Sequence, residues 1–94
     1  MGGIMHQKQC LISEWVVYIL ELSNGNYYTG ITNNLEKRLK RHINGKGSKI
    51  VRSYLPFKLI YTEKAKNRSE ASKRESTIKR LSRKEKENLI KEKK

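Results

Sequence analysis

The sequence predicts an α+β fold, in which a small three-stranded antiparallel sheet is flanked by helices in the order ββα-β-αα. Two segments rich in β-branched and aromatic residues flank an Asn-Gly pair, a pattern typical of a β-hairpin. Apolar residues recur at helical spacing before and after a third β-rich segment. One domain over residues 14–94, preceded by a flexible leader at residues 1–13, is the expected organisation.

The predicted hairpin turns at Asn24-Gly25, and its register depends on the length of the loop. A two-residue loop pairs Tyr18 with Ile31 and places Tyr18 and Tyr28 on opposite faces. A three-residue loop that ends in Gly25, with positive φ, pairs Tyr18 with Gly30 instead. The two tyrosines then share one face beside a glycine. The composition permits both registers, but only the second brings the tyrosines together.

The first predicted helix follows the hairpin directly. Asn33 and Asn34 are candidate caps, and Glu36 stands at capping-box spacing from Asn33. Gly45 ends the helical pattern, and residues 45–49 are expected to form a basic, flexible loop. The apolar stripe of this helix is formed by Leu35, Leu39 and Ile43.

The second half of the chain contains one strand and two helices. Residues 57–63, just after Pro56, are expected to form the third strand. From about Ser69 the pattern is helical to the end of the chain. Ser82 and Glu85 form a capping box that predicts the start of the last helix.

The charge balance is strongly basic and points to a partner. Twenty-two Lys and Arg against nine acidic residues give a net charge of +13, with a pI near 10.1. Such charge on a small domain is typical of nucleic-acid binding. The longest apolar run, Trp15–Leu20, is far shorter than the roughly 20 residues of a membrane span. With a lone Cys10 and no export signal, the sequence predicts a cytoplasmic protein that does not enter membranes.

The carboxylates limit the metal chemistry. None of the acidic residues is an aspartate, because all nine are glutamates. Two-metal nucleases hold their ions with clustered carboxylates that usually include Asp. Two histidines and one cysteine cannot supply a four-ligand zinc site on their own. Any metal chemistry is therefore expected to use one ion and very few ligands.

Three polar residues stand close to buried helix faces. Periodicity places Arg38 and His42 at the border of the apolar stripe of the first helix. An arginine stem covering the core and a hydrogen-bonded core histidine explain both without a function. Glu75 shares a stripe with Ala71 and Ile78, where an unpaired carboxylate is costly to desolvate. Its partner is therefore either a cation of the protein, in an internal ion pair, or a bound metal ion.

Four short motifs occur in a particular order along the chain. They are Val16-Val17-Tyr18, Tyr28-Thr29-Gly30, the segment Thr32–His42 with Arg38 inside it, and Glu70-Ala-Ser-Lys-Arg-Glu75. In this order and spacing the chain resembles the GIY-YIG endonuclease superfamily, and its small stand-alone single-domain bacterial members most. The resemblance extends from about Trp15 to Ile90.

The resemblance implies a metal-dependent endonuclease, a hydrolase of nucleic-acid phosphodiester bonds, with DNA rather than RNA as the expected substrate. The net charge of +13 predicts that it acts with little sequence specificity. The resemblance also implies one divalent cation held by Glu75, Mg²⁺ or alternatively Mn²⁺. Arg38 would stabilise the charge that develops on the phosphate. Tyr28 is the first candidate for the general base, and Tyr18 would position the water or the phosphate. His42 would orient Tyr28 or a water, or share the role of base.

The predicted binding surface is basic. Residues 64–94 alone carry 13 basic and 5 acidic side chains. A separate DNA-recognition domain is not expected, so a protein partner could supply target specificity. The cations expected to contact nucleic acid are Lys46, Lys49, Arg52, Lys73, Arg74 and Lys79.

Three positions depart from the family pattern. Val16 replaces the glycine of the first motif, and Thr29 replaces the usual aliphatic residue of the second. Ile31 stands where some relatives carry a lysine that helps to activate the tyrosine. The alternative hypothesis is therefore a catalytically weak or inactive module that binds nucleic acid. A basic accessory protein of ribosomes or nucleoids is a further alternative.

Overall fold

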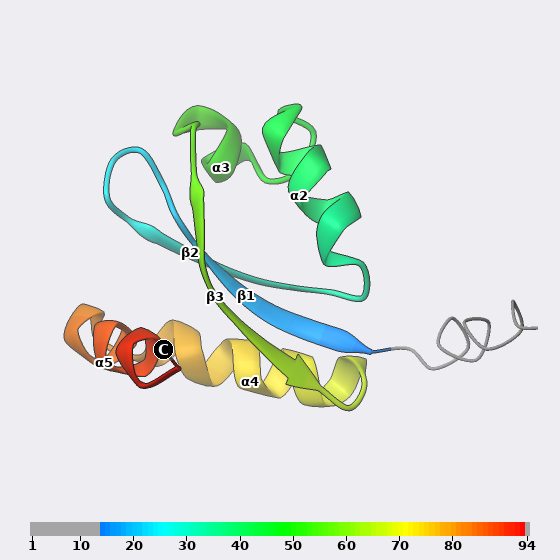
Figure 1. Cartoon of the computed structure of the whole chain (residues 1–94), viewed down its shortest axis with the longest axis vertical. Helices are drawn as coiled ribbons and strands as arrows, with labels where there is room; N and C mark the ends of the chain where they lie inside the picture. Colours follow the sequence, from blue (N-terminus) through cyan, green and yellow to red (C-terminus); the bar gives the residue numbers. More distant parts are fainter. Residues whose placement is uncertain (1–13, 94) are drawn as a thin grey trace, which may run out of the picture.

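In a computed structural model that describes residues 14–93, one sheet separates two layers of helices (Figure 1). Helices α2 and α3 cover one face, and α4 and α5 lie on the other. The predicted α+β fold with a three-stranded antiparallel sheet is confirmed. The predicted leader at residues 1–13 lies outside the described residues. The elements are β1 (Trp15–Glu21), β2 (Tyr27–Thr32), α2 (Leu35–Ile43), α3 (Lys49–Ser53), β3 (Lys58–Ala65), α4 (Arg68–Arg80) and α5 (Arg83–Lys93).

Strand β1 occupies the centre of the sheet, in the order β2-β1-β3. Side chains of successive residues point to opposite faces of a strand, so a central strand buries both sets. Val17 and Ile19 pack toward α4, whereas Tyr18 and Leu20 pack toward α2 and α3. Burial on both faces explains the continuous apolar run in β1, where a strand with one solvated face would alternate.

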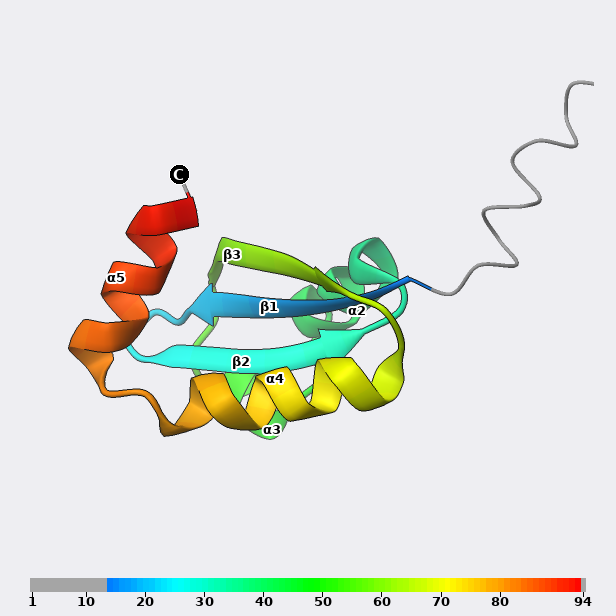
Figure 2. The ribbon, with the colours of Figure 1, turned by 90° about the horizontal axis from the view of Figure 1, so that it is seen from below.

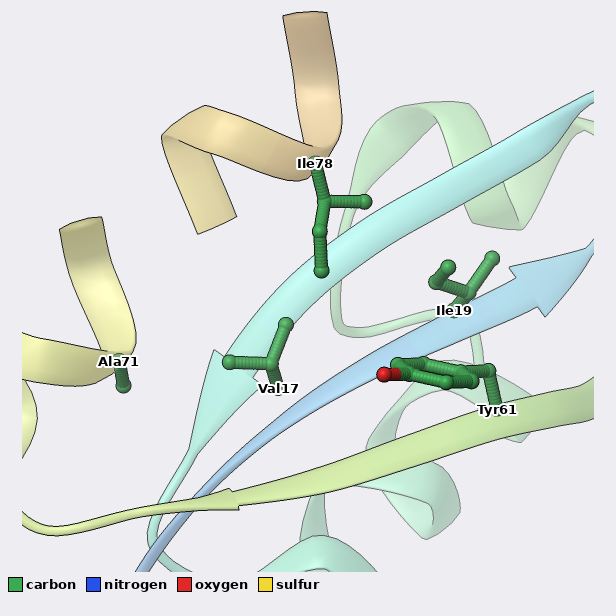
Figure 3. Packing of buried hydrophobic residues seen from close by; sticks show 5 residues of the cluster. All are labelled: Val17, Ile19, Tyr61, Ala71 and Ile78. Carbon is green, nitrogen blue, oxygen red and sulfur yellow. The ribbon is translucent and has the colours of Figure 1, made fainter. Parts of the chain in front are cut away.

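The core on the α4 side joins the sheet to the longest helix. Val17, Ile19 and Tyr61 of the sheet meet Ala71 and Ile78 of α4 in one buried cluster (Figure 3). Figure 2 shows α4 running alongside β2, and α4 contacts this edge strand more than it contacts β1 or β3. This placement brings one side of α4 close to the edge of the sheet.

The hairpin has the three-residue loop. The backbone N–H of Leu22 donates to the carbonyl of Asn26 at 2.8 Å, and Gly25 has φ 86°. Tyr18 consequently pairs with Gly30, so the register that places both tyrosines on one face is confirmed. Glycine suits position 25 because its φ lies in the left-handed region.

Helix α2 begins one residue later than the predicted capping box requires. Its cap is Asn34, whose side chain accepts from the N–H of Lys37 at 3.0 Å. The expected pairing of Asn33 with Glu36 is therefore wrong, because Glu36 falls in the first turn and is close to Lys40 instead. By contrast, the capping box at the start of α5 is confirmed by reciprocal bonds between Ser82 and Glu85, at 2.8 and 3.2 Å.

One further expectation in this region is wrong, and one short helix is absent from the prediction. Ile43 was expected on the buried stripe of α2 but is 62% exposed, because the helix turns His42 toward the sheet. The expected loop at 45–49 is found over residues 45–48, but Lys49 already begins the short helix α3, which the sequence pattern does not predict and which Ser48 caps. Val51 of α3 is fully buried in the cluster around Tyr18. Burial of this one valine gives α3 its place against the sheet.

None of the helices in the described part of the chain is long and apolar enough to cross a membrane.

Candidate active site

The ring of Tyr18 reaches the edge of the sheet because its neighbour on β2 is Gly30. The register pairs the two residues, and side chains of paired residues share a face. A Cβ atom at position 30 would lie 2.6 Å from the Tyr18 hydroxyl oxygen. Only glycine therefore leaves space for the phenol to lie across β2. Tyr28 stands beside it, with ring centroids 6.4 Å apart.

His42 meets the Tyr18 hydroxyl from α2. The imidazole Nε2 and the hydroxyl oxygen are 3.0 Å apart, and both residues are only 1% exposed. The imidazole also meets the rings of Tyr28 and Phe57 at near-perpendicular angles, with centroids 5.7 and 6.0 Å away. Three aromatic rings and one hydrogen bond thus hold the imidazole in place.

The other side of the imidazole is closed by Gly47. A Cβ atom at position 47 would overlap Nδ1 of His42, so the loop before α3 lies directly against the ring. Among the described residues, Nδ1 of His42 is the one buried side-chain polar atom that has no hydrogen-bond partner. The described part of the chain therefore anchors the imidazole by a hydrogen bond at Nε2, to Tyr18.

Both partners of this hydrogen bond are uncharged at neutral pH. Burial lowers the pKa of His42 below its usual 6.5, and the nearby Arg38 lowers it further. Burial raises the pKa of Tyr18 well above its usual 10. The negative charges that Tyr28 and Glu75 can carry raise it further, and Arg38 opposes them. A neutral phenol thus meets a neutral imidazole.

Arg38 stands one turn before His42 on α2 and is half-buried. Its charge acts on the pKa of both Tyr18 and His42, which places the guanidinium near their hydrogen bond. Arg38 lines a small hollow together with Lys37 and Arg41. Within the described residues, these three cations have no carboxylate partner. Their charge is free for a phosphate. The hollow has a volume of about 250 Å³ and is lined by Thr32, Asn33, Asn34, Lys37, Arg38 and Arg41.

Glu75 comes from α4, on the other side of the sheet. Helix α4 contacts the edge strand β2 more than it contacts the other two strands. The charge of the Glu75 carboxylate is close enough to raise the pKa of Tyr18. The Glu75 side chain is 21% exposed, and its Oε2 lies 3.4 Å from Nζ of Lys79. The predicted half-buried carboxylate is found, and in this structure its partner is a lysine.

The residue types around Glu75 fit a divalent ion with few protein ligands. In the described residues no group of three or more His, Cys, Asp and Glu side chains could hold a metal. Mg²⁺ is commonly bound by one or two carboxylates together with water and substrate phosphates. Glu75 can supply such a carboxylate.

The six predicted nucleic-acid-binding cations lie in two helical layers. Lys46, Lys49 and Arg52 are exposed around α3. On α4, Lys73 is exposed and lies 3.7 Å from Glu70, and Lys79 pairs with Glu75. Their contacts with nucleic acid stay predictions.

Arg74 has a partner inside the protein. Its Nε donates to Glu63 of β3 at 2.6 Å, and the Tyr61 hydroxyl donates to the same carboxylate. Burial and this carboxylate raise the pKa of Tyr61 to about 12. The network connects α4 to β3 through Arg74, the residue before Glu75, and so helps to position the Glu75 carboxylate.

Two residues of the site were not expected from the sequence. The sequence pattern places Phe57 in a strand and Gly47 in a flexible loop, and connects neither with the site. Phe57 contacts the imidazole through its ring, and Gly47 leaves space for it. The Gly45–Ser48 segment does carry a signal for a tight loop, but nothing in the pattern connects it with His42 on the preceding helix.

Comparison with known proteins finds relatives that match most of the chain. The profile of the GIY-YIG catalytic domain matches residues 14–88. A UPF0213 protein of Clostridium perfringens is 51% identical over 74 residues, which cover 79% of this chain and 80% of the relative. A UPF0213 protein of Bacillus licheniformis is 50% identical over 76 residues, covering 81% of this chain and 78% of the relative.

Two solution NMR structures are similar as well. The UPF0213 protein BH0048 from Bacillus halodurans has a TM-score of 0.55 and 41% identity, with 83% of both chains covered. The protein EF2693 from E. faecalis has a TM-score of 0.60 and 38% identity, again with 83% of both chains covered. From the domain match and these relatives, the chain belongs to the GIY-YIG family, a superfamily of nucleases.

Proposed function

We propose that this protein is a metal-dependent endonuclease that hydrolyses phosphodiester bonds of nucleic acid, DNA in preference to RNA. One observation carries the proposal. The Tyr18 hydroxyl is bonded to His42 and lies across Gly30. Burial raises its pKa most, and the charges of Tyr28, Arg38 and Glu75 also act on it. Charged groups of β2, α2 and α4 therefore lie close enough to the Tyr18 hydroxyl to affect its pKa, although α2 and α4 cover opposite faces of the sheet.

Arg38 would bind the phosphate that is cleaved. Its guanidinium is permanently charged and can make two parallel hydrogen bonds to phosphate oxygens. In the transition state these oxygens gain negative charge, so a fixed cation lowers the barrier. The neighbouring hollow with Lys37 and Arg41 extends the same positive field.

Glu75 would hold the divalent ion, Mg²⁺ or Mn²⁺. When bound, such an ion polarises the phosphate and stabilises charge on its oxygens. The carboxylate is half-buried on α4, a helix that Arg74 and Glu63 tie to the sheet. A ligand on so well-anchored a helix can keep its position relative to the phosphate beside Arg38.

Tyr28 is the better candidate for the general base. The Tyr18 hydroxyl is engaged by His42, and burial raises the pKa of its phenol, so Tyr18 resists ionisation. Tyr28 is half-buried on the same face. Tyr28 would accept the proton of the attacking water. Tyr18 would then position the water or phosphate, and His42 would orient Tyr18 and contact the Tyr28 ring.

The contacts with nucleic acid would be made with its backbone. Exposed lysines and arginines bind phosphates regardless of sequence. Little sequence specificity is therefore expected of the chain itself, and a protein partner would supply any specific target.

A catalytically weak nucleic-acid-binding module is the second candidate. One observation favours it: Ile31 packs toward the α4 side of the sheet, so position 31 supplies no cation beside the tyrosines. The nuclease proposal relies on Arg38 for this charge.

The test is cleavage by the purified protein. The panel contains duplex, flapped and single-stranded DNA and the matching RNAs, each with Mg²⁺, with Mn²⁺ and with EDTA. Nuclease function predicts metal-dependent internal cuts in at least one DNA substrate. Binding without cleavage on the whole panel would support the second candidate, and neither binding nor cleavage would contradict both.

A further inference from the structure

The ion pair between Glu75 and Lys79 differs from the other ion pairs within single helices. Of the four such pairs in the described residues, it contains the least exposed carboxylate, at 21%. The carboxylate of Glu70, which pairs with Lys73 on the same helix, is 54% exposed. A half-buried carboxylate needs a counter-charge more than an exposed one does. Lys79 supplies that charge.

We propose that Lys79 is the resident counter-ion of Glu75, which a divalent cation must displace and which then binds the phosphate backbone of the substrate. This inference rests on the proposed role of Glu75 as metal ligand. The lysine would thus hold the carboxylate in the absence of metal and act as a substrate-binding residue in its presence.

The two cations exclude each other at the carboxylate. Nζ of Lys79 lies 3.4 Å from Oε2 of Glu75, one of the two oxygens that an ion could use. An ammonium and a divalent ion on one carboxylate repel each other strongly at such distances. Metal binding therefore requires the lysine to leave.

The lysine can leave easily. Its side chain is 56% exposed, so water can solvate the ammonium once the pair opens. Exposed pairs spaced four residues apart on a helix stabilise little. The four-carbon stem allows Nζ to swing outward without any change in the helix. Lys79 therefore competes only weakly with the metal ion for the Glu75 carboxylate. Its effect on metal affinity is large enough to measure but too small to prevent metal binding.

The released lysine is well placed for nucleic acid. It stands one turn from Glu75 on α4, and the phosphate that shares the ion must lie next to that carboxylate. No other carboxylate among the described residues pairs with Lys79. A backbone phosphate is then the nearest new partner. Metal binding and nucleic-acid binding would favour each other through this one side chain, and such coupling is reciprocal.

The test measures Mn²⁺ binding to the full chain by calorimetry, with no nucleic acid present. Lys79→Met keeps most of the stem and removes the charge. Lys73→Met is the matched control, because it removes one charge from the same helix where the partner is Glu70 at 3.7 Å. We expect Lys79→Met to bind Mn²⁺ about two- to fivefold more tightly, the range for an ion pair whose ammonium is exposed to water. Lys73→Met should bind as the wild type does.

Glu75→Gln separates the inference about Lys79 from the proposed role of Glu75 as metal ligand. Loss of Mn²⁺ binding in Glu75→Gln, with unchanged affinity in Lys79→Met, would overturn the inference and leave the metal role of Glu75 standing. Equal Mn²⁺ binding by wild type and Glu75→Gln would overturn both. As a second readout, the NMR signal of the Lys79 side chain should shift on addition of Mg²⁺ to the wild type. An unshifted signal at saturating Mg²⁺ would also overturn the inference.

Discussion

The ring of Tyr18 lies across the backbone of Gly30, so closely that a methyl group there would come to 2.6 Å from the hydroxyl oxygen. Tyr18 belongs to the central strand and Gly30 to the edge strand. The glycine therefore lets a buried residue of the central strand present its hydroxyl at the edge of the sheet. There it meets His42 from α2 and the charge of Glu75 from α4.

Gly30→Ala should displace the Tyr18 ring and strongly reduce cleavage. A shift of about 1 Å in a catalytic group can cost about 10²-fold in rate. A double-mutant cycle isolates the cause: in a Tyr18→Leu background the added methyl group has no hydroxyl to meet, so it should destabilise the fold less. The measurement is the free energy of unfolding in urea. An equal cost of Gly30→Ala in both backgrounds would contradict this contact.

Mild acid should destabilise the protein through His42. Burial holds the pKa of the folded imidazole below 6.5, so the unfolded chain takes up a proton first as the pH falls. This contribution to stability is present above pH 6.5 and is lost as the pH falls from there toward the lowered pKa. Thermal unfolding between about pH 8 and pH 5 should show a steeper loss for wild type than for His42→Asn. Parallel profiles would show that His42 is not the group responsible.

Nucleic-acid binding should depend on salt through the hollow beside Arg38. Lys37→Gln and Arg41→Gln should each reduce the slope of log affinity against log salt by about 0.9 on duplex DNA, the value for one phosphate contact. Lys40→Gln on the same helix is the control, since Lys40 lies outside the hollow and 3.9 Å from Glu36. Fluorescence anisotropy without divalent cation measures all three. The same change in slope for Lys40→Gln would remove any special role of the hollow.

Arg38→Lys should lose turnover and keep affinity. The substitution preserves the charge but replaces a planar fork with a single ammonium, which cannot make two parallel hydrogen bonds. Losing one such contact in the transition state typically costs about 10²–10³ in rate. Single-turnover cleavage with DNA affinity measured in parallel separates the two effects. Wild-type cleavage by Arg38→Lys would mean that Arg38 contributes only to the positive surface.

Much of the fold followed from local pattern in the sequence. The Asn24-Gly25 turn predicted the hairpin, and the requirement that Tyr18 and Tyr28 share a face selected the observed register. The Ser82–Glu85 capping box marked the start of α5. These features depend on interactions between residues close together in the chain, so local sequence patterns are enough to predict them.

The errors concern contacts between distant segments. Ile43 continued the apolar spacing of α2, but the helix is rotated so that His42 faces the sheet. The rotation depends on the hydrogen bond to Tyr18 and on the space left by Gly47, neither of which is visible in periodicity. Helix α3 was missed because its five residues are too few to show a helical pattern, and Val51 alone anchors it.

The sequence predicts which residues belong to the candidate site but not how they are arranged in space. Motif order selected Tyr18, Tyr28, Arg38, His42 and Glu75. That Glu75 pairs with Lys79, and that Arg74 pairs with Glu63 on β3, depends on how α4 lies on the sheet. Many cations could have reached either carboxylate, so sequence reasoning could not choose between them.

The central claim is that Glu75 holds the ion for hydrolysis, and Mg²⁺-dependent cleavage by Glu75→Gln tests it most directly. Glu70→Gln is the matched control, because Glu70 is an exposed carboxylate of the same helix with its own lysine partner. We expect wild type and Glu70→Gln to cleave DNA alike, and Glu75→Gln to lose cleavage by about 10²-fold or more while keeping its DNA affinity and melting temperature. Equal cleavage by all three proteins, or a Glu75→Gln protein whose only change is a lower melting temperature, would contradict the account.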